Sequence, residues 1–565
     1  MARNYTRKAG YNRNYHPSVT TQVDERQILN DAGGYVFKVD DMNRLRRFLI
    51  FGTEGGTYYV SERKLTRDNA DFITGLLESR NGLKAIDEVV DVSNKGQALK
   101  NDPAIFVLAL AATCNNPVTR SYALKHLKDI CRISTHLFTF LTYVKDLKSG
   151  TGWGRALRNA IADWYNSKSP SDLAYQVCKY PSRKVEGSMP WSHKDVLRKA
   201  HVVPFGLERD FIYQYIVAGF NNDKIRTCID KKGKTITSKT QPVTSDLLYK
   251  FDNLRYIRGH EMAKNANRVD DVIDAIEGYG VTRESIPNEY FSDIHVWEAL
   301  FVNMPMTAMI RNLGKMTEVG LLAPFSDATK TVVDVLGNKE ILKKSRIHPL
   351  QVFSAWRTYK SGHGFKGGLT WNPVPAIVGA LEDAFYKSFE YVEPTGKNIL
   401  LSIDMSGSMG YNVSNIPDTN LTNIAAIVAM TIVRTEPNYH VIGFDTKIYD
   451  NLNITKHDSL ETVIKKINPR GGTNISLTFK HAMEKNIKNI DAFVILTDNE
   501  TYLGEHPFRV FDDYKRVHNS HCKLVYAAMN ATQSTLIHPN NDGNSMDIVG
   551  WSNDVPKVIS EFIKF

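Results

Sequence analysis

The stretch "NILLSIDMSGSMG", residues 398–410, joins an apolar, strand-like run to a turn that carries Asp404, Ser406 and Ser408. A short apolar run that ends in glycine and serine is typical of a buried strand followed by a loop. Ligands of open α/β sheets bind beyond the carboxyl ends of the strands. An oxygen-rich loop at this place therefore indicates a site for a cation or a phosphate group.

The pattern of this stretch recurs through residues 391–565. Helix-like segments alternate there with strand-like runs, namely "NILLSID", "YHVIGFD", "AFVILTD" and "CKLVYAAM". Continuous apolar strands that alternate with helices predict a parallel, doubly wound sheet. We therefore expect residues 391–565 to form one α/β domain.

Three loops of this domain supply oxygen atoms at strand or helix boundaries: "DMSGS", "GGTN" (471–474) and "TDNE" (497–500). The candidate ligands in these loops are Asp404, Ser406, Ser408, Thr473 and Asp498. Carboxylate and hydroxyl oxygens suit a hard divalent metal ion such as Mg²⁺. The loops lack the lysine of a phosphate-binding P-loop, which argues against a nucleoside triphosphate site.

Two other interpretations of these loops stay open. A serine- and glycine-rich turn can exist without any ion. A metal-dependent hydrolase acting on nucleic acid would need a general base and usually a second ion, and Glu500 and Asp445 are residues of the right type. An aspartyl nucleophile would normally want a second acid two residues on, where this chain has Ser406.

The order of the three loops adds a resemblance to a known family. DxSxS at 404–408, then Thr473, then Asp498 resembles the metal-ion-dependent adhesion site of von Willebrand factor A domains. The resemblance implies a bound metal ion whose open coordination position accepts a carboxylate from a protein partner. It also implies a domain that binds and does not catalyse.

The preceding part of the chain, residues 26–390, has a helical pattern. Residues 121–147, for example, place apolar side chains at three- and four-residue steps, which predicts an amphipathic helix or a pair of helices. Short loops with Gly, Pro or Asn separate such segments and favour stacked helical pairs of a repeat (HEAT-like) kind. Residues 230–246 are expected to form an exposed polar loop. Residues 1–25 are expected to be a flexible basic tail, in which Arg and Lys alternate with Tyr.

Charge is unevenly distributed along the chain. Residues 1–390 have a net charge of +13, whereas residues 391–565 have a net charge of −3. Residues 120–200 alone hold 15 Lys and Arg against 6 Asp and Glu, a net charge of +9. This asymmetry indicates a polyanionic partner for the helical part of the chain.

The segment 178–201, "CKYPSRKVEGSMPWSHKDVLRKAH", combines cations with aromatic residues. If "SHKDVLRKAH" is a helix, Lys194, Arg198 and His201 fall on one face. Cations beside aromatic rings are what phosphate contacts and base stacking require. A solvated helix face would have the same composition, and His193 and His201 could instead be histidines of the core.

"KYPSR" and "PWSHKDVLRKAH" resemble the Ro ribonucleoprotein family, whose helical part is the TROVE module. Stretches at 136–165, 296–322 and 347–386 agree with that family in order, and the similarity is to its bacterial-type members. The resemblance covers about residues 30–565, including the A domain. It implies a ring of helical repeats with a positively charged central hole, closed by the A domain.

The resemblance also implies a function and a set of RNA-binding residues. Family members bind small noncoding Y RNAs on the outer face of the ring and single-stranded ends of misfolded RNAs through the hole. Bacterial members can tether a Y RNA to an exoribonuclease, in RNA degradation or quality control. By position, the Y RNA face would contain Lys179, Arg183, His193 and His201, and the charge pattern adds Lys194 and Arg198 to the RNA-binding candidates. The basic surface of the ring would contain Arg132, Lys145, Arg155 and Arg158.

Other features of the sequence bound the class of protein. Five scattered cysteines without a CxxC pair argue against a zinc cluster or a disulfide framework and favour a reducing compartment. The N-terminus lacks a secretory signal, and the longest apolar runs are about half the length of a membrane span. We expect a cytoplasmic, monomeric, non-enzymatic RNA-binding scaffold without a membrane partner. A protein-assembly factor that acts through the A domain is the further alternative.

Overall fold

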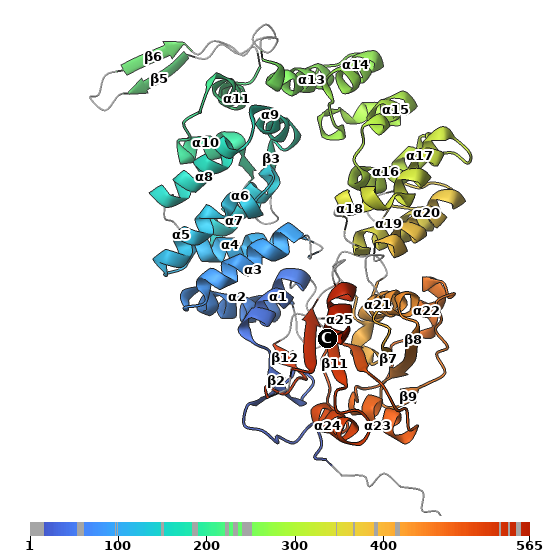
Figure 1. Ribbon diagram of the computed structural model, residues 1–565. Coiled ribbons are helices and arrows are strands. Elements are labelled where there is room, and N and C mark those ends of the chain that lie inside the picture. The colour runs from blue at the N-terminus through green and yellow to red at the C-terminus, as the bar shows by residue number, and fades with distance from the viewer. Residues whose placement is uncertain are drawn as a thin grey trace, which may run out of the picture.

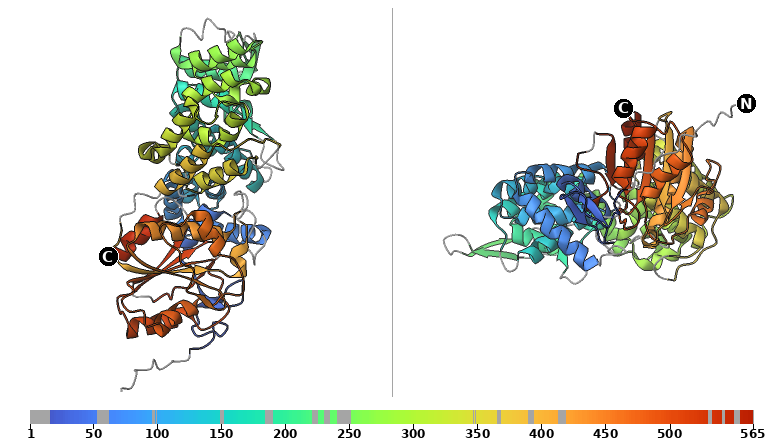
Figure 2. Two further views of the ribbon diagram at one scale, coloured as in Figure 1. Left: turned by 90° about the vertical axis from the view of Figure 1, so that its right-hand side faces the viewer. Right: turned by 90° about the horizontal axis from the view of Figure 1, so that it is seen from below.

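The computed structural model describes residues 16–52, 62–95, 98, 100–148, 152–183, 190–220, 225–229, 235–239, 251–345, 347, 349–364, 368–388, 394–412, 419–529, 533–540, 543–549 and 555–564. Two limbs of helices and an α/β domain are arranged in a closed ring, as Figure 1 shows. The limbs meet at the end opposite the α/β domain, which joins their other ends. In the edge-on view of Figure 2 the limbs stack above the α/β domain.

The first limb contains the helices from α1 to α11. They are α1 (Asp41–Phe51), α2 (Glu62–Glu78), α3 (Gly82–Lys95), α4 (Asp102–Thr113), α5 (Pro117–Lys125), α6 (Leu127–Ile130), α7 (Ser134–Leu147), α8 (Arg155–Ser167), α9 (Pro170–Lys179), α10 (His193–Ala200) and α11 (Leu207–Ala218). Two short strands, β3 (Ser182–Arg183) and β4 (Trp191–Ser192), pair between α9 and α10. One apolar core runs through this limb, with Trp164 and Tyr165 fully buried.

The second limb contains the helices from α13 to α20. They are α13 (Arg255–Lys264), α14 (Val269–Tyr279), α15 (Ile294–Val302), α16 (Met306–Glu318), α17 (Asp327–Gly337), α18 (Lys339–Ser345), α19 (Pro349–Ser361) and α20 (Pro375–Lys387). Short 3₁₀ turns lie at Asp252–Leu254 (η1), Arg283–Ser285 (η2) and Asn288–Ser292 (η3). The helical repeat predicted for this part of the chain is confirmed.

Local sequence explains where several helices begin. Asn116 and Ser169 accept hydrogen bonds from backbone N–H groups in the first turns of α5 and α9, and proline follows each of them. The predicted amphipathic segment at 121–147 is divided among α5, α6 and α7. Each piece buries its apolar side chains in the core of the first limb.

The prediction of a polar loop at 230–246 is wrong for the residues of this range that the structure describes, 235–239. Residues Thr235–Lys239 form strand β6, which pairs antiparallel with β5 (Ile225–Ile229) in a hairpin beside α11 (Figure 1). The β-branched residues of "IRTCI" and "TITSK" favour extended backbone. The other residues of 230–246 lie outside the described part of the chain.

The α/β domain has the predicted doubly wound sheet. Its strands are β7 (Asn398–Asp404), β8 (Asn438–Phe444), β9 (Ile448–Tyr449), β10 (Ala492–Thr497), β11 (Lys523–Ala528) and β13 (Ser545–Val549), in the spatial order β13-β11-β10-β7-β8-β9. All neighbours are parallel except β8 and β9. The remaining elements are α21 (Leu421–Thr435), α22 (Leu460–Lys466), α23 (Ser476–Glu484), α24 (Pro507–Val517), α25 (Val555–Lys564), β12 (Ser534–Thr535) and η4 (Gly407–Gly410).

Two apolar cores lie on the two faces of this sheet. On one face, buried residues of β7, β10 and α21 belong to the same cluster as Trp356 and Leu381 of the second limb. On the other face, α23 and α24 cover Phe493 and Tyr526. The α/β domain therefore shares a continuous apolar core with the second limb.

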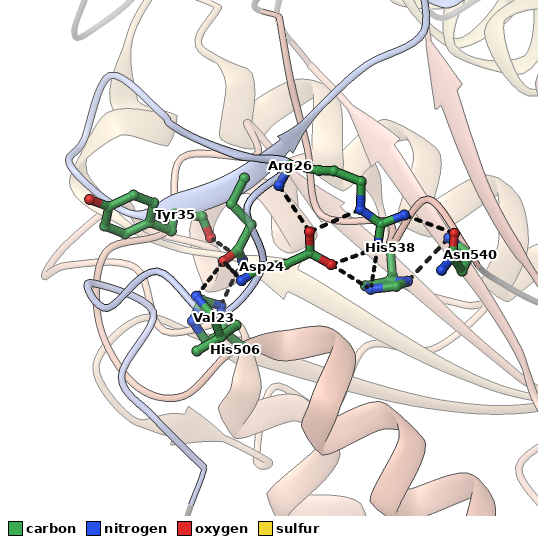
Figure 3. Close-up of polar contacts among 8 residues, drawn as sticks. Val23, Asp24, Arg26, Tyr35, His506, His538 and Asn540 are labelled. Carbon is green, nitrogen blue, oxygen red and sulfur yellow. Dashed lines mark hydrogen bonds and ion pairs between the residues drawn. The ribbon is translucent and has the colours of Figure 1, made fainter.

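The start of the described chain is part of the α/β domain. Strands β1 (Gln27–Leu29) and β2 (Tyr35–Lys38) pair antiparallel, and β2 pairs with β12. Residues 1–15 of the expected tail lie outside the described residues, whereas Val19 is buried and donates its N–H to Gly504 O at 2.8 Å. Figure 3 shows Arg26 donating to Asp24 and to Asn540, beside His538.

The first limb meets the α/β domain through polar contacts. Arg47 of α1 is fully buried and donates to the Asp547 carboxylate of β13 at 2.7 Å and to Ser534 O at 2.6 Å. We call Arg47, Ser534 and Asp547 the polar seam. At the other limb, Leu460 N donates to the Tyr386 hydroxyl of α20, and Lys360 pairs with Glu461. These contacts close the ring.

Candidate functional site

The carboxyl ends of two neighbouring strands form the centre of the candidate metal site. Strands β7 and β10 are parallel, with Ile403 opposite Leu496. The chain continues from β7 to β8 on one side and later returns to β10 on the other, so this edge is the switch point of the sheet. The register brings Thr497 to Asp404, and the Thr497 hydroxyl donates to the Asp404 carboxylate at 2.6 Å.

Backbone contacts bring the three predicted loops together. Gly407 N donates to Gly471 O at 3.0 Å, which joins the first loop to the second. Leu503 N donates to Thr473 O at 3.2 Å, which joins the third loop to the second. Gly471 has a φ of +69° and lies against the Asp445 carboxylate, so a larger residue would be strained and crowded there. The loop geometry thus depends on glycine at this position.

The five predicted ligands are all buried at this edge of the sheet. Ser406 N donates to Asp404 Oδ1 at 2.8 Å, and the Ser406 and Ser408 hydroxyls are 3.1 Å apart. The Thr473 hydroxyl is buried and, within the described part of the chain, has no hydrogen-bond partner. The structure therefore assembles Asp404, Ser406, Ser408, Thr473 and Asp498 from three separate loops.

The electrostatics of these residues fit a cation. Burial raises the pKa of Asp404 to about 6, with a contribution from the Asp445 charge. Burial and the nearby Asp404 carboxylate raise the pKa of Asp498 to about 7. A divalent ion would offset the free-energy cost of burying two carboxylates and could be bound by the Thr473 hydroxyl. Within the described residues no three or more His, Cys, Asp or Glu side chains lie together as a metal cluster. The candidate site has two carboxylates, and its other candidate ligands are hydroxyls.

The two residues considered for a hydrolase have other partners. The Asp445 carboxylate accepts hydrogen bonds from Lys447 N at 2.9 Å and from the Tyr449 hydroxyl at 2.8 Å. The Glu500 carboxylate accepts a hydrogen bond from Ala32 N at 3.1 Å. Both carboxylates thus bind backbone or side chains that hold the loops in place.

A basic cavity lies on the second limb and is also lined by one residue of the first limb. It has a volume of about 540 Å³ and is lined by Lys100, just before α4, and by residues of η2, α16, α19 and the segment that follows α19. Its cations are Lys100, Arg283, Arg311 and Lys315, of which Lys315 pairs with Glu318 of α16, and none of the described lining residues is acidic. Tyr359 and Trp371 supply aromatic rings. Sequence reasoning missed this site because its cations are dispersed over more than 200 residues.

Comparisons with known proteins agree along nearly the whole chain. The TROVE domain model matches residues 28–358, and the Ro60 vWA domain model matches residues 398–563. This chain belongs to the Ro60 family. The RNA-binding protein RO60 of Caenorhabditis elegans is 34% identical over 604 residues, covering 97% of this chain and 91% of that protein.

A bacterial member of the Ro60 family is similar to the same extent. The RNA-binding protein RO60 of Deinococcus radiodurans is 33% identical, covering 96% of this chain and 97% of that protein. The crystal structure of the Deinococcus radiodurans RO (RSR) protein matches with a TM-score of 0.67 and 31% identity, over 93% of this chain and 99% of that one. The predicted family and fold class are confirmed.

The segment from the end of α9 to the C-cap of α10 contains six predicted RNA-binding residues, four from the family resemblance and two from the charge pattern. Among them His193 is buried, its Nδ1 lies 2.7 Å from the Tyr165 hydroxyl, and its ring packs edge-on against Phe138. Burial lowers the pKa of His193 to about 3, so the ring is neutral. His193 therefore lies in the core of the Ro60 helical limb, and the expected place on an RNA face does not fit its burial.

The charged residues predicted in and next to α10 are more accessible than His193. Lys194 is half-buried, whereas Arg198, Lys199 and His201 are exposed. The helix ends at Ala200, and His201 caps it in the left-handed conformation with a φ of 53°. Arg198 thus lies in the last turn of α10 and His201 directly beyond the helix. The cations remain close, although they do not continue along one helical face.

Lys179 and Arg183 are both near carboxylates of other elements. Lys179 donates to the Tyr175 hydroxyl at 2.7 Å and lies 3.7 Å from the Glu284 carboxylate. Arg183, on β3, lies 3.8 Å from Asp102 at the start of α4. RNA that contacts these two cations must compete with the existing ion pairs.

The four residues predicted for the basic surface are dispersed over the first limb. Arg132 donates to the Ser93 hydroxyl and to the Asn94 side chain. Lys145 on α7 and Arg155 on α8 are exposed, and Arg158 on α8 is half-buried. The structure thus leaves Lys145 and Arg155 accessible and uses Arg132 to hold the end of α3.

Among the described residues no helix is long and apolar enough to cross a bilayer.

Proposed function

We propose that this chain is an RNA-binding scaffold without catalytic activity. The observation that carries the proposal is the basic cavity on the second limb, which is lined by four cations and, among the described residues, by no acid. Nucleic acids suit such a site, because each phosphate that binds a cation of the protein releases counterions and so favours binding. The RNA-binding names of the relatives support the same conclusion.

The cavity fits a single strand. Its volume of about 540 Å³ suits one or a few nucleotides, and the half-buried Trp371 ring lines it together with Arg311, whereas Tyr359 is buried. Arg311 is exposed, and the Arg283 guanidinium lies over the Phe291 ring at 5.0 Å. We propose that single-stranded ends of misfolded RNA bind here.

A second RNA surface is proposed around α10 on the first limb. Arg198, Lys199 and His201 are exposed there, and within the described residues no carboxylate pairs with them. We propose that a small noncoding Y RNA binds this surface and that the complex acts in RNA quality control in the cytoplasm. An exoribonuclease tethered through the bound RNA would then supply the cleavage that this chain does not.

The A domain is proposed to bind Mg²⁺ through Asp404, Ser406, Ser408, Thr473 and Asp498. A bound ion would hold the three loops together and would present a coordination position to a carboxylate of a protein partner. The residues around it bind and orient the ion. None of them is placed to act as a general base, since Asp445 and Glu500 accept the hydrogen bonds described above.

RNA binding in the cavity can be tested with a 20-nucleotide oligouridine labelled with fluorescein at its 5′ end. Replacing Arg283 and Arg311 with alanine should weaken binding about tenfold or more and lower the slope of log K against log salt by about 0.7 for each lost phosphate contact. The matched control replaces Arg268 and Lys330, exposed cations of the same limb that pair with Asp270 and Asp327. Equal affinities of the two double variants in fluorescence anisotropy would exclude the cavity as the binding site.

A further inference from the structure

The loop between α10 and α11 exposes three large apolar side chains. Val203, Phe205 and Leu207 retain 76%, 77% and 68% of their accessible surface. Single exposed apolar residues are ordinary on protein surfaces. Three of them within five residues form a patch, and exposed apolar patches mark binding sites.

This patch, Val203, Phe205 and Leu207, is held on an ordered loop. The Arg209 guanidinium donates to Phe205 O at 3.0 Å, to Asn166 O at 3.2 Å and to Lys168 O. Gly206 has a φ of +92°, which turns the chain sharply beside Phe205. Arg209 therefore ties the loop to the end of α8, and the phenyl ring is displayed to solvent instead of being packed inward.

Charges of both signs lie beside the patch, with the cations on its α10 side and two carboxylates on its α11 side. Arg198 and Lys199 lie in the last turn of α10 and His201 caps the helix, all three exposed. The carboxylates that follow the patch, on Glu208 and Asp210, accept hydrogen bonds from Asn253 and Gln214. A partner with phosphate groups would contact the α10 side of the patch, where Arg198 and Lys199 are exposed.

The aromatic residues expected to stack on RNA in this region are not free to do so. Trp191 is buried against Trp153, with the ring centroids 5.6 Å apart, and Tyr180 is half-buried beside Lys179. Phe205 is thus an exposed ring close to the α10 cations, and Trp153, half-buried with Lys199 Nζ over its ring at 6.0 Å, is a second ring there. Unpaired nucleotides have the required combination of a phosphate charge and a flat base.

We infer that Val203, Phe205 and Leu207 form a stacking platform for unpaired bases of an RNA whose phosphates contact Arg198, Lys199 and His201. The inference rests on the proposed RNA-binding function and assigns to this surface the single-stranded parts of its ligand. Phe205 supplies the face on which a base stacks, and the aliphatic side chains on either side of it limit solvent access. Double-stranded RNA offers no free base face and gains nothing from the platform.

The test uses two fluorescein-labelled RNAs and matched variants of the full chain. One RNA is a 12-base-pair hairpin with an eight-adenosine loop, and the other is a blunt 12-base-pair duplex. Phe205→Ala should weaken hairpin binding about tenfold, since one stacked base contributes that much, and leave duplex binding and the salt slope unchanged. Phe205→Trp should bind the hairpin like the native chain, and Phe205→Leu should bind it like Phe205→Ala.

Phe325→Ala is the control, because Phe325 is 90% exposed on the second limb and should not affect either RNA. Equal hairpin affinities of Phe205→Ala and the native chain would overturn the inference and would assign the patch to a protein partner. Native-like binding by Phe205→Leu would exclude stacking and overturn it as well. If the native chain binds neither RNA, the proposed function itself fails.

Discussion

Arg47 and Asp547 are 500 residues apart in the sequence and 2.7 Å apart in the structure, both with buried side chains. They join the first helix of the first limb to the last strand of the A domain. The second limb is attached to the same domain by a continuous apolar core. The two attachments of the ring thus differ in kind, and the polar one depends on very few side chains.

The polar seam predicts a strong effect of removing one partner. Arg47→Ala should destabilise the chain by about 3–5 kcal/mol, because it leaves the Asp547 carboxylate buried without its cation. Replacing Arg47 by Met and Asp547 by Leu together should recover much of the loss, since no buried charge remains. Urea denaturation measures both effects. Equal stability of Arg47→Ala and the native chain would contradict the structural role of the pair.

The candidate metal site predicts stabilisation by Mg²⁺. At a free concentration 100 times the Kd, the ion should add about 2.7 kcal/mol to the free energy of unfolding. Asp404→Ala and Asp498→Asn should abolish this gain. Thermal denaturation with and without Mg²⁺, together with calorimetric titration, measures it. A native chain that does not respond to the ion would favour an ion-free serine- and glycine-rich turn.

Thr473 provides a sharper test of the same site. Its hydroxyl is buried without a described partner, so Thr473→Val should leave metal-free stability unchanged or raised by roughly 1 kcal/mol while it abolishes the Mg²⁺ response. The matched variant is Thr478→Val, because the Thr478 hydroxyl is bonded to Ser402 at 2.7 Å. That change should cost about 1–3 kcal/mol and keep the Mg²⁺ response. The opposite pattern would place the ion elsewhere.

Burial of His193 predicts a dependence of stability on pH. The folded-state pKa is about 3 and the ordinary value is 6.5, so between these values the unfolded chain binds a proton that the folded chain does not. The contribution of this residue is complete above pH 6.5 and is lost toward pH 3, at about 1.4 kcal/mol per pH unit. His193→Gln should lower the slope of the free energy of unfolding against pH in this range by about 1.4 kcal/mol per pH unit, the contribution of one proton. Identical slopes would mean that the ring is accessible to solvent in the folded state.

The two groups of predicted RNA cations should differ in their effects. Replacing Arg198 and Lys199 with alanine should weaken binding of the labelled hairpin more than replacing Lys179 and Arg183, because the latter pair already contacts Glu284 and Asp102. Both double variants should unfold like the native chain. Gel shifts at two salt concentrations measure the difference. A stronger effect of Lys179 and Arg183 would move the RNA surface toward α9 and β3.

A scaffold should leave its RNA intact. Under the proposed function, incubation of the pure chain with 5′-labelled RNA and Mg²⁺ should leave the RNA at full length on a denaturing gel, because the Asp445 and Glu500 carboxylates are engaged by the Tyr449 hydroxyl and by Ala32 N. Asp404→Ala is the control for contaminating nuclease. Cleavage by the native chain that disappears in Asp404→Ala would establish a hydrolase.

Much of the A domain could be predicted because its signals are local. Each buried strand is a continuous apolar run, and each metal-ligand candidate directly follows a strand or precedes a helix. Parallel strands bring their carboxyl ends to one edge, so Asp404 and Asp498 had to lie close together once β7 and β10 were neighbours. The helical repeat was likewise visible in the spacing of apolar residues.

Whether a side chain in a charged segment is buried was harder to predict than the strands were. His193 shares a helical face with Val196, Leu197 and Ala200, all buried, and this spacing was available in the sequence as a signal for the core. The cations of the basic cavity gave no such signal, because Lys100 and Arg311 come together only through the closure of the ring. Pairing of β2 with β12 was equally hidden, since register between distant edge strands leaves no local pattern.

The pairing of β2 with β12 has a consequence for biosynthesis. At ribosomal speeds of about 5–20 residues per second, the strand at Tyr35–Lys38 is made roughly half a minute or more before its partner at Ser534–Thr535. During that interval its hydrogen-bonding edge has no native neighbour, which is the situation that invites misassociation of nascent chains. Translation must therefore continue past Thr535 before β2 can pair with β12.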